Sequence, residues 1–127
     1  MAFLSFSNVG SNPHPLSNKV AKAVGIVKSR RPDLRVDGEM QADTAVVPAI
    51  SEERYPLSEV KDANVLVFPS LESANIAYKL LARLGNAKAI GPILLGVGAP
   101  VHVLQTGDDV NASVQIASVA VMDAMGR

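Results

Sequence analysis

The stretch that decides the fold runs from Asn64-Val-Leu-Val-Phe-Pro69 through Ser70–Gly85 to Ala89-Ile-Gly-Pro-Ile-Leu-Leu-Gly96. Its first piece is a short run of β-branched and aromatic residues, which is typical of a strand buried on both faces. Its last piece is again apolar and bounded by turn residues. The stretch therefore predicts a strand, a helix and a second strand, which is the unit from which parallel sheets are built.

The middle piece of this stretch predicts an amphipathic helix over 70–84. Ser70 can cap it, because a serine hydroxyl accepts a hydrogen bond from a free backbone N–H of the first turn. Gly85 is expected to end the helix, because glycine readily adopts the backbone conformation that follows a helix. The residues separate into two faces. The apolar face consists of Ala74, Ala77, Tyr78, Leu80, Leu81 and Leu84, and the polar face of Glu72, Asn75, Lys79 and Arg83.

Further elements follow from the same periodicities. Strands are expected at Ala2–Phe6 and Leu34–Glu39, and helices at about Leu16–Ser29 and Met40–Val47. Leu16, Val20, Ala23, Val24 and Val27 are expected to face inward on the first of these helices. The polar segment 49–62 is interpreted as a surface connection with one helical turn. Alternation of strands and helices predicts an α/β protein.

The composition is that of a globular protein and limits its partners. A chain of 127 residues, 48% hydrophobic and 19% charged, is long enough to bury a core. Twelve basic and twelve acidic residues leave no net charge, so nothing indicates binding to nucleic acid or to an anionic membrane. The absence of cysteine excludes a disulfide framework and a thiolate nucleophile, and it favours the cytoplasm.

Both ends of the sequence indicate a piece of a longer protein. A strand-like run starts at Ala2 without the basic region of a signal peptide, so we expect Met1 to begin a fragment. The last predicted helix, 109–125, carries apolar residues most of the way round. We therefore expect one domain over 1–127, with an α/β core at 2–107 and the helix at 109–125 packed on a partner domain or subunit.

Two groups of polar residues are candidates for ligand binding. The loop Ser7-Asn-Val-Gly-Ser-Asn12 follows the first predicted strand, and α/β proteins bind ligands at strand ends. Asn75 and Lys79 lie on the polar face of the helix that starts near Ser70, whose N-terminus can attract phosphate oxygens. Taken alone, both groups are better explained as an ordinary loop and a solvated helix face than as a binding site.

Other chemistry is less well supported by the residue spacing. Asp37 and Glu39 share a face of a predicted strand and could act as paired carboxylates or as magnesium ligands together with Asp43. The alternative is a turn around Gly38 with Gln41 or an aspartate capping the next helix. The two histidines have no carboxylate at ligand spacing, and the sequence contains no Gly-x-Ser-x-Gly elbow.

Several motifs, in order along the chain, carry a family resemblance. They are Phe3-Leu-Ser-Phe-Ser7 with the loop after it, Asp37-Gly-Glu-Met-Gln-Ala-Asp43, Asn75–Gly85 and Gly91-Pro-Ile-Leu-Leu-Gly96. They resemble the C-terminal half of the phosphate acetyl/butyryltransferase (phosphotransacetylase) family, over nearly the whole chain. The resemblance implies an isocitrate/isopropylmalate dehydrogenase-like fold, a three-layer open sheet with helices on both faces. It also implies that Ser7, Asn8, Gly10, Ser11, Asn12, Asn75 and Lys79 border a cleft for acyl-coenzyme A and phosphate.

The chain departs from the pattern of active family members. Those proteins carry a Ser-Arg-Gly triplet and then an aspartate, and the resemblance gives the arginine and the aspartate the catalytic roles. This chain has Gln105-Thr106-Gly107 in place of the triplet and Ala112 in place of the aspartate. The resemblance therefore implies no catalytic residue here, and it leaves Gln105 and Thr106 as ligand-binding candidates. No metal ligand is predicted.

A narrower resemblance points to a domain of a larger enzyme. The segments 3–11, 96–104 and 119–124 resemble the phosphotransacetylase-like C-terminal domain of bacterial NADP-dependent malic enzymes. This implies a non-catalytic regulatory and oligomer-forming domain that senses acetyl-CoA. NADP and a divalent metal are then expected only in N-terminal domains, where malate is decarboxylated. The alternatives are a phosphate acetyltransferase, which interconverts acetyl-CoA and acetyl phosphate, and a domain kept only for assembly.

Overall fold

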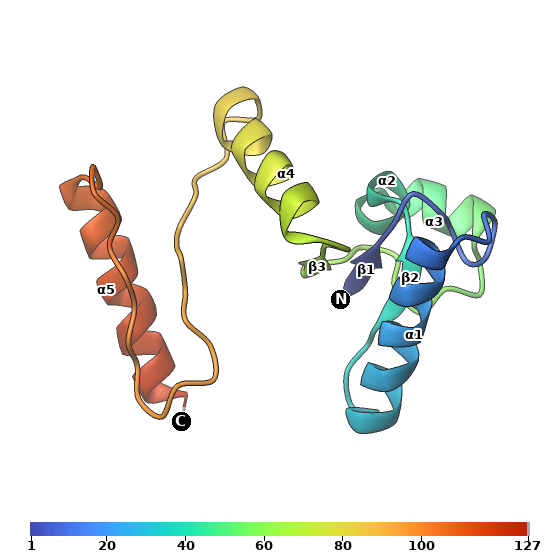
Figure 1. Ribbon diagram of the computed structural model, residues 1–127, viewed down its shortest axis with the longest axis horizontal. Helices are drawn as coiled ribbons and strands as arrows, with labels where there is room; N and C mark the ends of the chain where they lie inside the picture. Colours follow the sequence, from blue (N-terminus) through green and yellow to red (C-terminus); the bar gives the residue numbers. More distant parts are fainter. Residues whose placement is uncertain (127) are drawn as a thin grey trace. The chain divides into compact units, whose positions relative to one another are not determined.

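The computed structural model describes residues 1–126, and Figure 1 shows its helices and strands. The chain divides into two compact units, the first covering Met1–Ala77 and the second beginning at Tyr78. The prediction of one domain over 1–127 stays a prediction. Within residues 1–126, every helix falls short of the length and apolar character that crossing a membrane requires.

A three-stranded parallel sheet, in the order β2-β1-β3, forms the centre of the first unit (Figure 1). Its strands are β1 (Ala2–Leu4), β2 (Asp37–Met40) and β3 (Leu66–Val67). β1 pairs with both neighbours, so Ala2 lies opposite Asp37 on one side and Leu66 on the other. The strands predicted at Ala2–Phe6 and near residue 66 are confirmed in shorter form, whereas the strand predicted at Leu34–Glu39 begins only at Asp37 and continues through Met40, where a helix is expected to begin.

The prediction that the strand near residue 66 is buried on both faces is wrong. Among residues 1–126, β3 pairs only with β1, and both of its residues are half-buried. Ala2 and Leu4 are buried instead, because β1 has a hydrogen-bonded neighbour on each side. The strand at the start of the chain is therefore the central one.

Three helices lie wholly within the first unit: α1 (Pro15–Arg30), α2 (Ala42–Val46) and α3 (Pro48–Arg54). The side chain of His14 accepts a hydrogen bond from the Leu16 N–H, and the Ser17 hydroxyl accepts one from the His14 N–H. This reciprocal cap starts α1 at Pro15. Leu16 is consequently 55% exposed rather than inward, while Ser17, Val20 and Val24 share the buried face.

The segment 49–62 is predicted to be a connection with one helical turn, but the helix there, α3, is longer and has 7 residues. Pro48 lies at the first position of α3, where its fixed φ suits a helix start and its missing N–H costs nothing. The buried Ser51 hydroxyl donates to the carbonyl oxygen of Pro48 and, at 3.1 Å, to that of Lys61. The helix is thereby tied to the chain that leads to β3.

Apolar side chains cover the sheet from two sides. One hydrophobic cluster gathers buried residues of β1, β2, α2 and the chain before β3; its members are Ala2, Leu4, Met40, Ala45, Val60 and Ala63. Val20 and Val24 of α1 are buried outside this cluster, and α1 contacts β1 and β2. Because Ala2 and Leu4 point to the same face, α1 is left to cover the other face.

α4 (Leu71–Leu84) begins and ends where the sequence predicts. The Ser70 hydroxyl accepts a hydrogen bond from the Ser73 N–H at 3.2 Å, and the helix ends directly before Gly85. Its apolar face is open in the described structure, where no residue of α4 is buried and Leu80 and Leu81 are about half exposed.

The predicted strand at 89–96 is wrong. After α4 the chain is extended, but none of the residues described in the structure forms a strand with this segment. A strand needs a hydrogen-bonded neighbour, and an apolar composition alone does not supply one. Ile93, Leu94 and Leu95 are exposed as a result.

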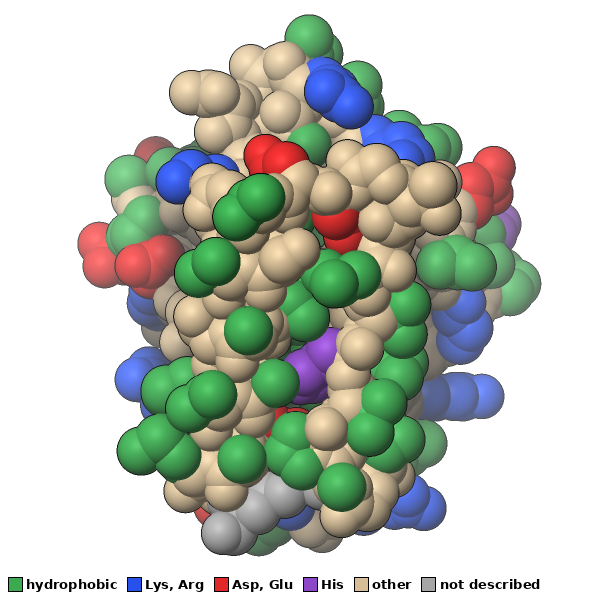
Figure 2. Space-filling view, turned by 90° about the vertical axis from the view of Figure 1, so that its left-hand side faces the viewer, with side chains coloured by type: hydrophobic (Ala, Val, Ile, Leu, Met, Phe, Trp, Pro, Cys, Tyr) green, Lys and Arg blue, Asp and Glu red, His purple; other side chains and the backbone are tan. Residues whose placement is uncertain are grey.

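α5 (Val110–Met125) matches the predicted C-terminal helix. The Asp109 carboxylate caps it by accepting a hydrogen bond from the Ala112 N–H at 2.8 Å. The extended chain passes beside this helix, where His102 Nε2 lies 3.9 Å from the Asp123 carboxylate. Ile116 faces inward, and Figure 2 shows hydrophobic side chains over the surface that carries α5.

Gly38 lets β2 approach β1 closely. Its φ is +139°, and a Cβ atom built there would lie 2.6 Å from the carbonyl oxygen of Phe3. We expect Gly38→Ala to lower the free energy of unfolding by at least about 1 kcal/mol, because alanine is strained at this φ and clashes with backbone. Urea denaturation followed by circular dichroism measures this.

Gly25 provides the matched control for this substitution. It lies within α1, and a Cβ atom there would meet nothing within 4 Å. Gly25→Ala is therefore expected to raise stability by about 0.5–1 kcal/mol, as alanine does in helix interiors. Equal stabilities of the two variants would show that the contact with Phe3 does not restrict position 38.

Candidate functional site

The loop Ser7–Asn12 directs much of its polarity into the protein. Ser7 and Asn8 are buried, whereas Gly10, Ser11 and Asn12 are exposed. The Ser7 hydroxyl donates to Glu39 Oε1 at 2.8 Å, and the Gly10 N–H donates to the same oxygen at 2.7 Å. The Asn12 N–H donates to Ser7 Oγ at 3.1 Å. These groups are already hydrogen-bonded inside the first unit.

Asn8 fastens the loop to the residue after β2. Its side-chain oxygen accepts a hydrogen bond from the Gln41 N–H at 2.7 Å, and Gln41 Nε2 donates to the Phe6 carbonyl oxygen at 2.8 Å. Of the five loop candidates, Ser11 and Asn12 therefore present exposed side chains. A ligand can reach these two side chains, of which the Ser11 hydroxyl already accepts a hydrogen bond from the Asn8 N–H at 3.0 Å and lies 3.4 Å from the Ser7 hydroxyl.

The turn expected around Gly38 is replaced by a strand, because Asp37 and Glu39 both lie in β2, and Gln41 precedes α2 without capping it through its side chain. Asp37 accepts hydrogen bonds from the Ser58 hydroxyl at 2.7 Å and the Glu59 N–H at 3.0 Å. Glu39 instead contacts the loop, as described above. Within residues 1–126, no three histidine or carboxylate side chains are grouped so that they could hold a metal.

The environment of Asp37 lowers its pKa. Burial acts in the opposite direction and is the largest single influence, but it is outweighed by the hydrogen bonds from the Ser58 hydroxyl and the backbone N–H groups of Gly38 and Glu59. Lys28 Nζ, 3.7 Å away, adds a favourable positive charge. The carboxylate form of Asp37 therefore stabilises the first unit.

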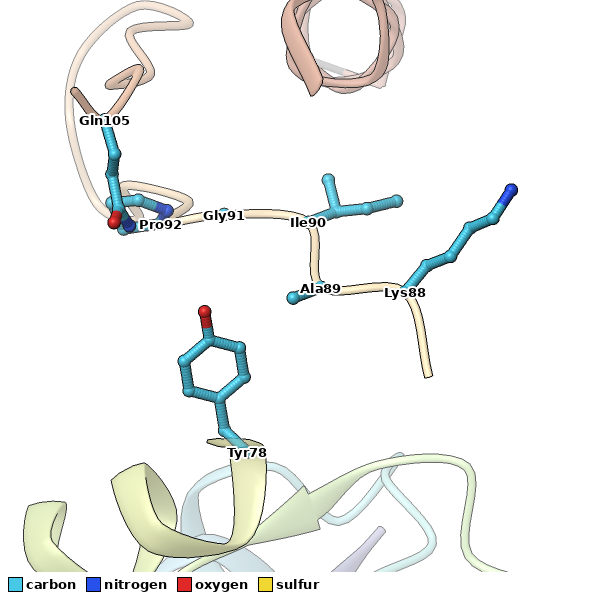
Figure 3. A pocket seen from close by; sticks show the side chains of 7 residues that line it. All are labelled: Tyr78, Lys88, Ala89, Ile90, Gly91, Pro92 and Gln105. Atoms are coloured by element: carbon cyan, nitrogen blue, oxygen red, sulfur yellow. The ribbon is translucent and has the colours of Figure 1, made fainter. Parts of the chain in front are cut away.

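A cavity of about 450 Å³ lies within the second unit and contains one of the predicted residues. It is lined by Tyr78, Lys88, Ala89, Ile90, Gly91, Pro92 and Gln105. Figure 3 shows the Tyr78 hydroxyl and the Gln105 side chain pointing toward the same space, whereas the Lys88 ammonium points away. Two polar groups thus converge on a hollow lined by both polar and apolar residues, as small-molecule sites are.

Lys79 lies next to this cavity. Its Nζ atom is 5.1 Å from the centre of the Tyr78 ring, a distance at which a cation interacts favourably with an aromatic face. Asn75 precedes Lys79 by four residues, so both lie on one face of α4. The second unit therefore brings a cation, a phenol and the Gln105 amide together.

The turn that contains Gln105 and Thr106 is held by hydrogen bonds between its own residues. The Gln105 N–H donates to the Asp108 carboxylate at 2.7 Å, and the Asp108 N–H donates to the Gln105 carbonyl oxygen. The neighbouring Asp109 carboxylate caps α5. Both carboxylates of the turn therefore accept hydrogen bonds from backbone N–H groups.

The predicted site residues fall into both units. Ser7, Asn8, Gly10, Ser11, Asn12 and Asn75 belong to the first, and Lys79, Gln105 and Thr106 to the second. Sequence reasoning missed Tyr78, which it placed on the apolar face of the helix. A tyrosine beside a lysine could have indicated the site, because the ring is apolar and the hydroxyl needs a polar partner.

Comparisons with known proteins match nearly the whole chain. Residues 1–121 match the family described as phosphate acetyl/butaryl transferase. The phosphate acetyltransferase of Bacillus subtilis is 47% identical over 126 residues, which are 98% of this chain and 39% of that protein. The NADP-dependent malic enzyme of Escherichia coli K12 is 43% identical over 127 residues, 98% of this chain and 17% of that protein.

The fold agrees with a solved structure. The crystal structure of a phosphotransacetylase from Streptococcus pyogenes superposes with a TM-score of 0.92 at 42% identity, over 99% of this chain and 39% of that chain. Both resemblances seen in the motifs, to phosphotransacetylases and to a region of malic enzymes, are confirmed. The chain spans well under half the length of each of these relatives.

The depressed pKa of Asp37 predicts a pH-dependent contribution to stability. A carboxyl whose pKa is lower when folded stabilises the protein above its unfolded pKa of about 3.9, and the contribution disappears as the pH falls through the folded value. We expect Asp37→Asn to be less stable by about 1–3 kcal/mol at pH 7, because hydrogen bonds to a charged acceptor are lost.

Urea denaturation between pH 7 and pH 2 measures this contribution. The difference between Asp37→Asn and the unmodified chain should narrow below about pH 4. Asp62→Asn serves as the control, since Asp62 is an exposed aspartate. A difference that stayed constant down to the lowest pH would contradict the assigned role of the Asp37 charge.

Proposed function

The chain belongs to the phosphate acetyl/butaryl transferase family, and on this premise we propose that it is a non-catalytic regulatory and assembly domain of an NADP-dependent malic enzyme. The proposed ligand is acetyl-CoA. The observation that carries the proposal is the turn 105–108, which has Gln105-Thr106-Gly107 where the family resemblance expects Ser-Arg-Gly.

The composition of this turn argues against acyl transfer. Moving an acetyl group between phosphate and a thiol needs a cation to stabilise developing charge and a base to take the thiol proton. Thr106 is neutral, and Ala112 occupies the place of the expected aspartate. Asp108 and Asp109 are hydrogen-bonded to backbone N–H groups. The turn therefore has polar groups that can bind a ligand, but it lacks the cation and the base that acyl transfer needs.

The cavity beside Tyr78 supports a ligand of the acyl-CoA class. Such a ligand combines apolar segments with phosphate oxygens, and the cavity combines Ile90 and Pro92 with the polar tips of Tyr78 and Gln105. Lys79 adds a positive charge on the adjacent surface of α4. Within the first unit taken by itself, the exposed side chains of Ser11 and Asn12 are the ligand contacts that we propose.

The remaining parts of the proposal concern the whole protein. We propose an isocitrate/isopropylmalate dehydrogenase-like arrangement with helices on both faces of the sheet, and a cytoplasmic enzyme. NADP and a divalent metal belong, in this proposal, to N-terminal malic enzyme domains that act on malate. This chain itself requires no cofactor for the proposed role.

Phosphate acetyltransferase is the second candidate function. It is favoured by the similarity to the Bacillus subtilis enzyme of that name over nearly the whole chain. An assay with acetyl phosphate and coenzyme A separates the two candidates, because the regulatory proposal expects no turnover above background. Turnover that is abolished by Lys79→Ala would favour the transferase and contradict the proposal.

Binding of acetyl-CoA provides the direct test. Lys79→Ala is expected to weaken binding by about tenfold or more, because a charge-assisted contact to phosphate contributes on the order of 1.5–3 kcal/mol. Binding should also weaken as salt is added. Isothermal titration calorimetry measures both effects. Lys22→Ala, a change of an exposed lysine on α1, is the matched control and should leave the affinity unchanged.

The absence of heat and of a thermal shift at millimolar acetyl-CoA would contradict ligand sensing. Assembly would then be the surviving function.

Self-association is the other half of the proposed role. The exposed surface of α5 has an apolar hollow lined by Val114, Ala117, Ser118, Val121 and Met122. Hydrophobic side chains gather over this helix in Figure 2. Contiguous apolar patches of this kind are uncommon on monomers and usually mark interaction sites. We propose that α5 packs against a second copy of the chain or an adjoining domain.

Val114→Glu is expected to shift the purified chain from dimer to monomer, because a carboxylate in the interface must be desolvated without a partner. Light scattering measures the molar mass. Asn111→Glu adds the same charge at an exposed polar position of α5 and should leave the mass unchanged. A monomeric unmodified chain would refute self-association through this helix.

A further inference from the structure

Glu39 is a buried carboxylate without a basic partner. The residue is 4% exposed, and none of the ion pairs found among residues 1–126 includes it. A buried charge needs compensation from hydrogen-bond donors when no opposite charge is present. The loop Ser7–Asn12 provides these donors.

The donors converge on a single oxygen atom. The Ser7 hydroxyl and the Gly10 N–H both donate to Glu39 Oε1, at 2.8 Å and 2.7 Å. The Val9 N–H donates to the Glu39 carbonyl oxygen at 2.9 Å. A hydroxyl and a backbone N–H directed at one anionic oxygen form the kind of concave site in which proteins bind small anions. Here the anion is supplied by the chain itself.

The same hydrogen bonds extend to the start of α1. Ser7 Oγ accepts from the Asn12 N–H, and the Asn12 carbonyl oxygen accepts from the Ser17 hydroxyl at 2.8 Å. Ser17 also belongs to the cap of α1. The carboxylate of Glu39 thus lies at one end of a continuous chain of hydrogen bonds that runs through the loop into the helix.

We infer that Glu39 is an internal anion which fixes the conformation of the Ser7–Asn12 loop and so acts as a positioning residue for the exposed Ser11 and Asn12 side chains. The backbone N–H groups of Gly10 and Asn12 are bonded within the protein and are not available to a ligand. A ligand that binds this loop is therefore contacted by side chains and not by these two N–H groups. The inference does not depend on the identity of the ligand.

Amide hydrogen exchange, measured by NMR on the purified chain, tests this role. Glu39→Ala should raise exchange at Gly10 and Asn12 by about tenfold or more, because the acceptor that protects them is lost. Glu39→Gln should stay within about threefold of the unmodified chain, since one side-chain oxygen accepts both hydrogen bonds and glutamine retains one. Glu52→Ala, at an exposed glutamate of α3, should change neither amide.

Added acetate distinguishes an anion site from a general loss of stability. In Glu39→Ala, acetate should restore protection of the Gly10 amide in a concentration-dependent manner, and chloride at equal ionic strength should not. Restoration by both salts, or by neither, would overturn the inference. So would an Ala variant whose Gly10 and Asn12 amides exchange at the unmodified rate.

Ser7→Ala keeps the inference testable if Glu39→Ala does not fold. It removes the acceptor of the Asn12 N–H while leaving the carboxylate in place, so Asn12 exchange should rise by about tenfold and the amides within α1 should be unaffected. The inference would also be overturned if exchange at Asn12 were unchanged in Ser7→Ala. The same holds if the Gly10 and Asn12 amides of Glu39→Gln exchanged as fast as those of an unfolded chain.

Discussion

The pairing of β1 on both sides is the constraint on which the first unit depends. The Ala2 N–H donates to the Val65 carbonyl oxygen, the Asp37 N–H to that of Met1, and the Ser5 N–H to that of Met40. The strand β1, which is only 3 residues long, thereby brings together segments that are more than 30 positions apart in the sequence. The Ser7–Asn12 loop leaves the end of this strand, and Glu39 comes from its neighbour, so the strand pairing decides that the two meet.

Elements with local signals could be predicted well from the sequence. Ser70 and Asp109 each cap the helix that follows them, because a short polar side chain next to a free N–H is a property of neighbouring residues. The failure at 89–96 has a different cause. Its composition is that of a strand, yet strand formation depends on a partner that is often distant in sequence, and the local pattern carries no information about that partner.

The candidate site shows the same division between local and non-local information. The sequence identifies Ser7 and Asn8 as polar loop residues, but their burial follows from contacts with Glu39 and Gln41, more than 30 positions away. Tyr78 was assigned to the apolar face of its helix by periodicity. Its hydroxyl instead faces the cavity that contains Gln105, which a helical wheel cannot reveal. The type of a residue therefore indicates which contacts its side chain can make, and the tertiary structure determines which of these contacts it does make.

The extended segment between α4 and α5 has a consequence for solution behaviour. Ile93, Leu94 and Leu95 are exposed, and the backbone around them has no strand neighbour in the described structure. Unpaired backbone flanked by apolar side chains is a template for intermolecular β-pairing. Pro92, which has no backbone N–H, and Gly96 lie on either side of this run and limit the length of any ladder that could form there.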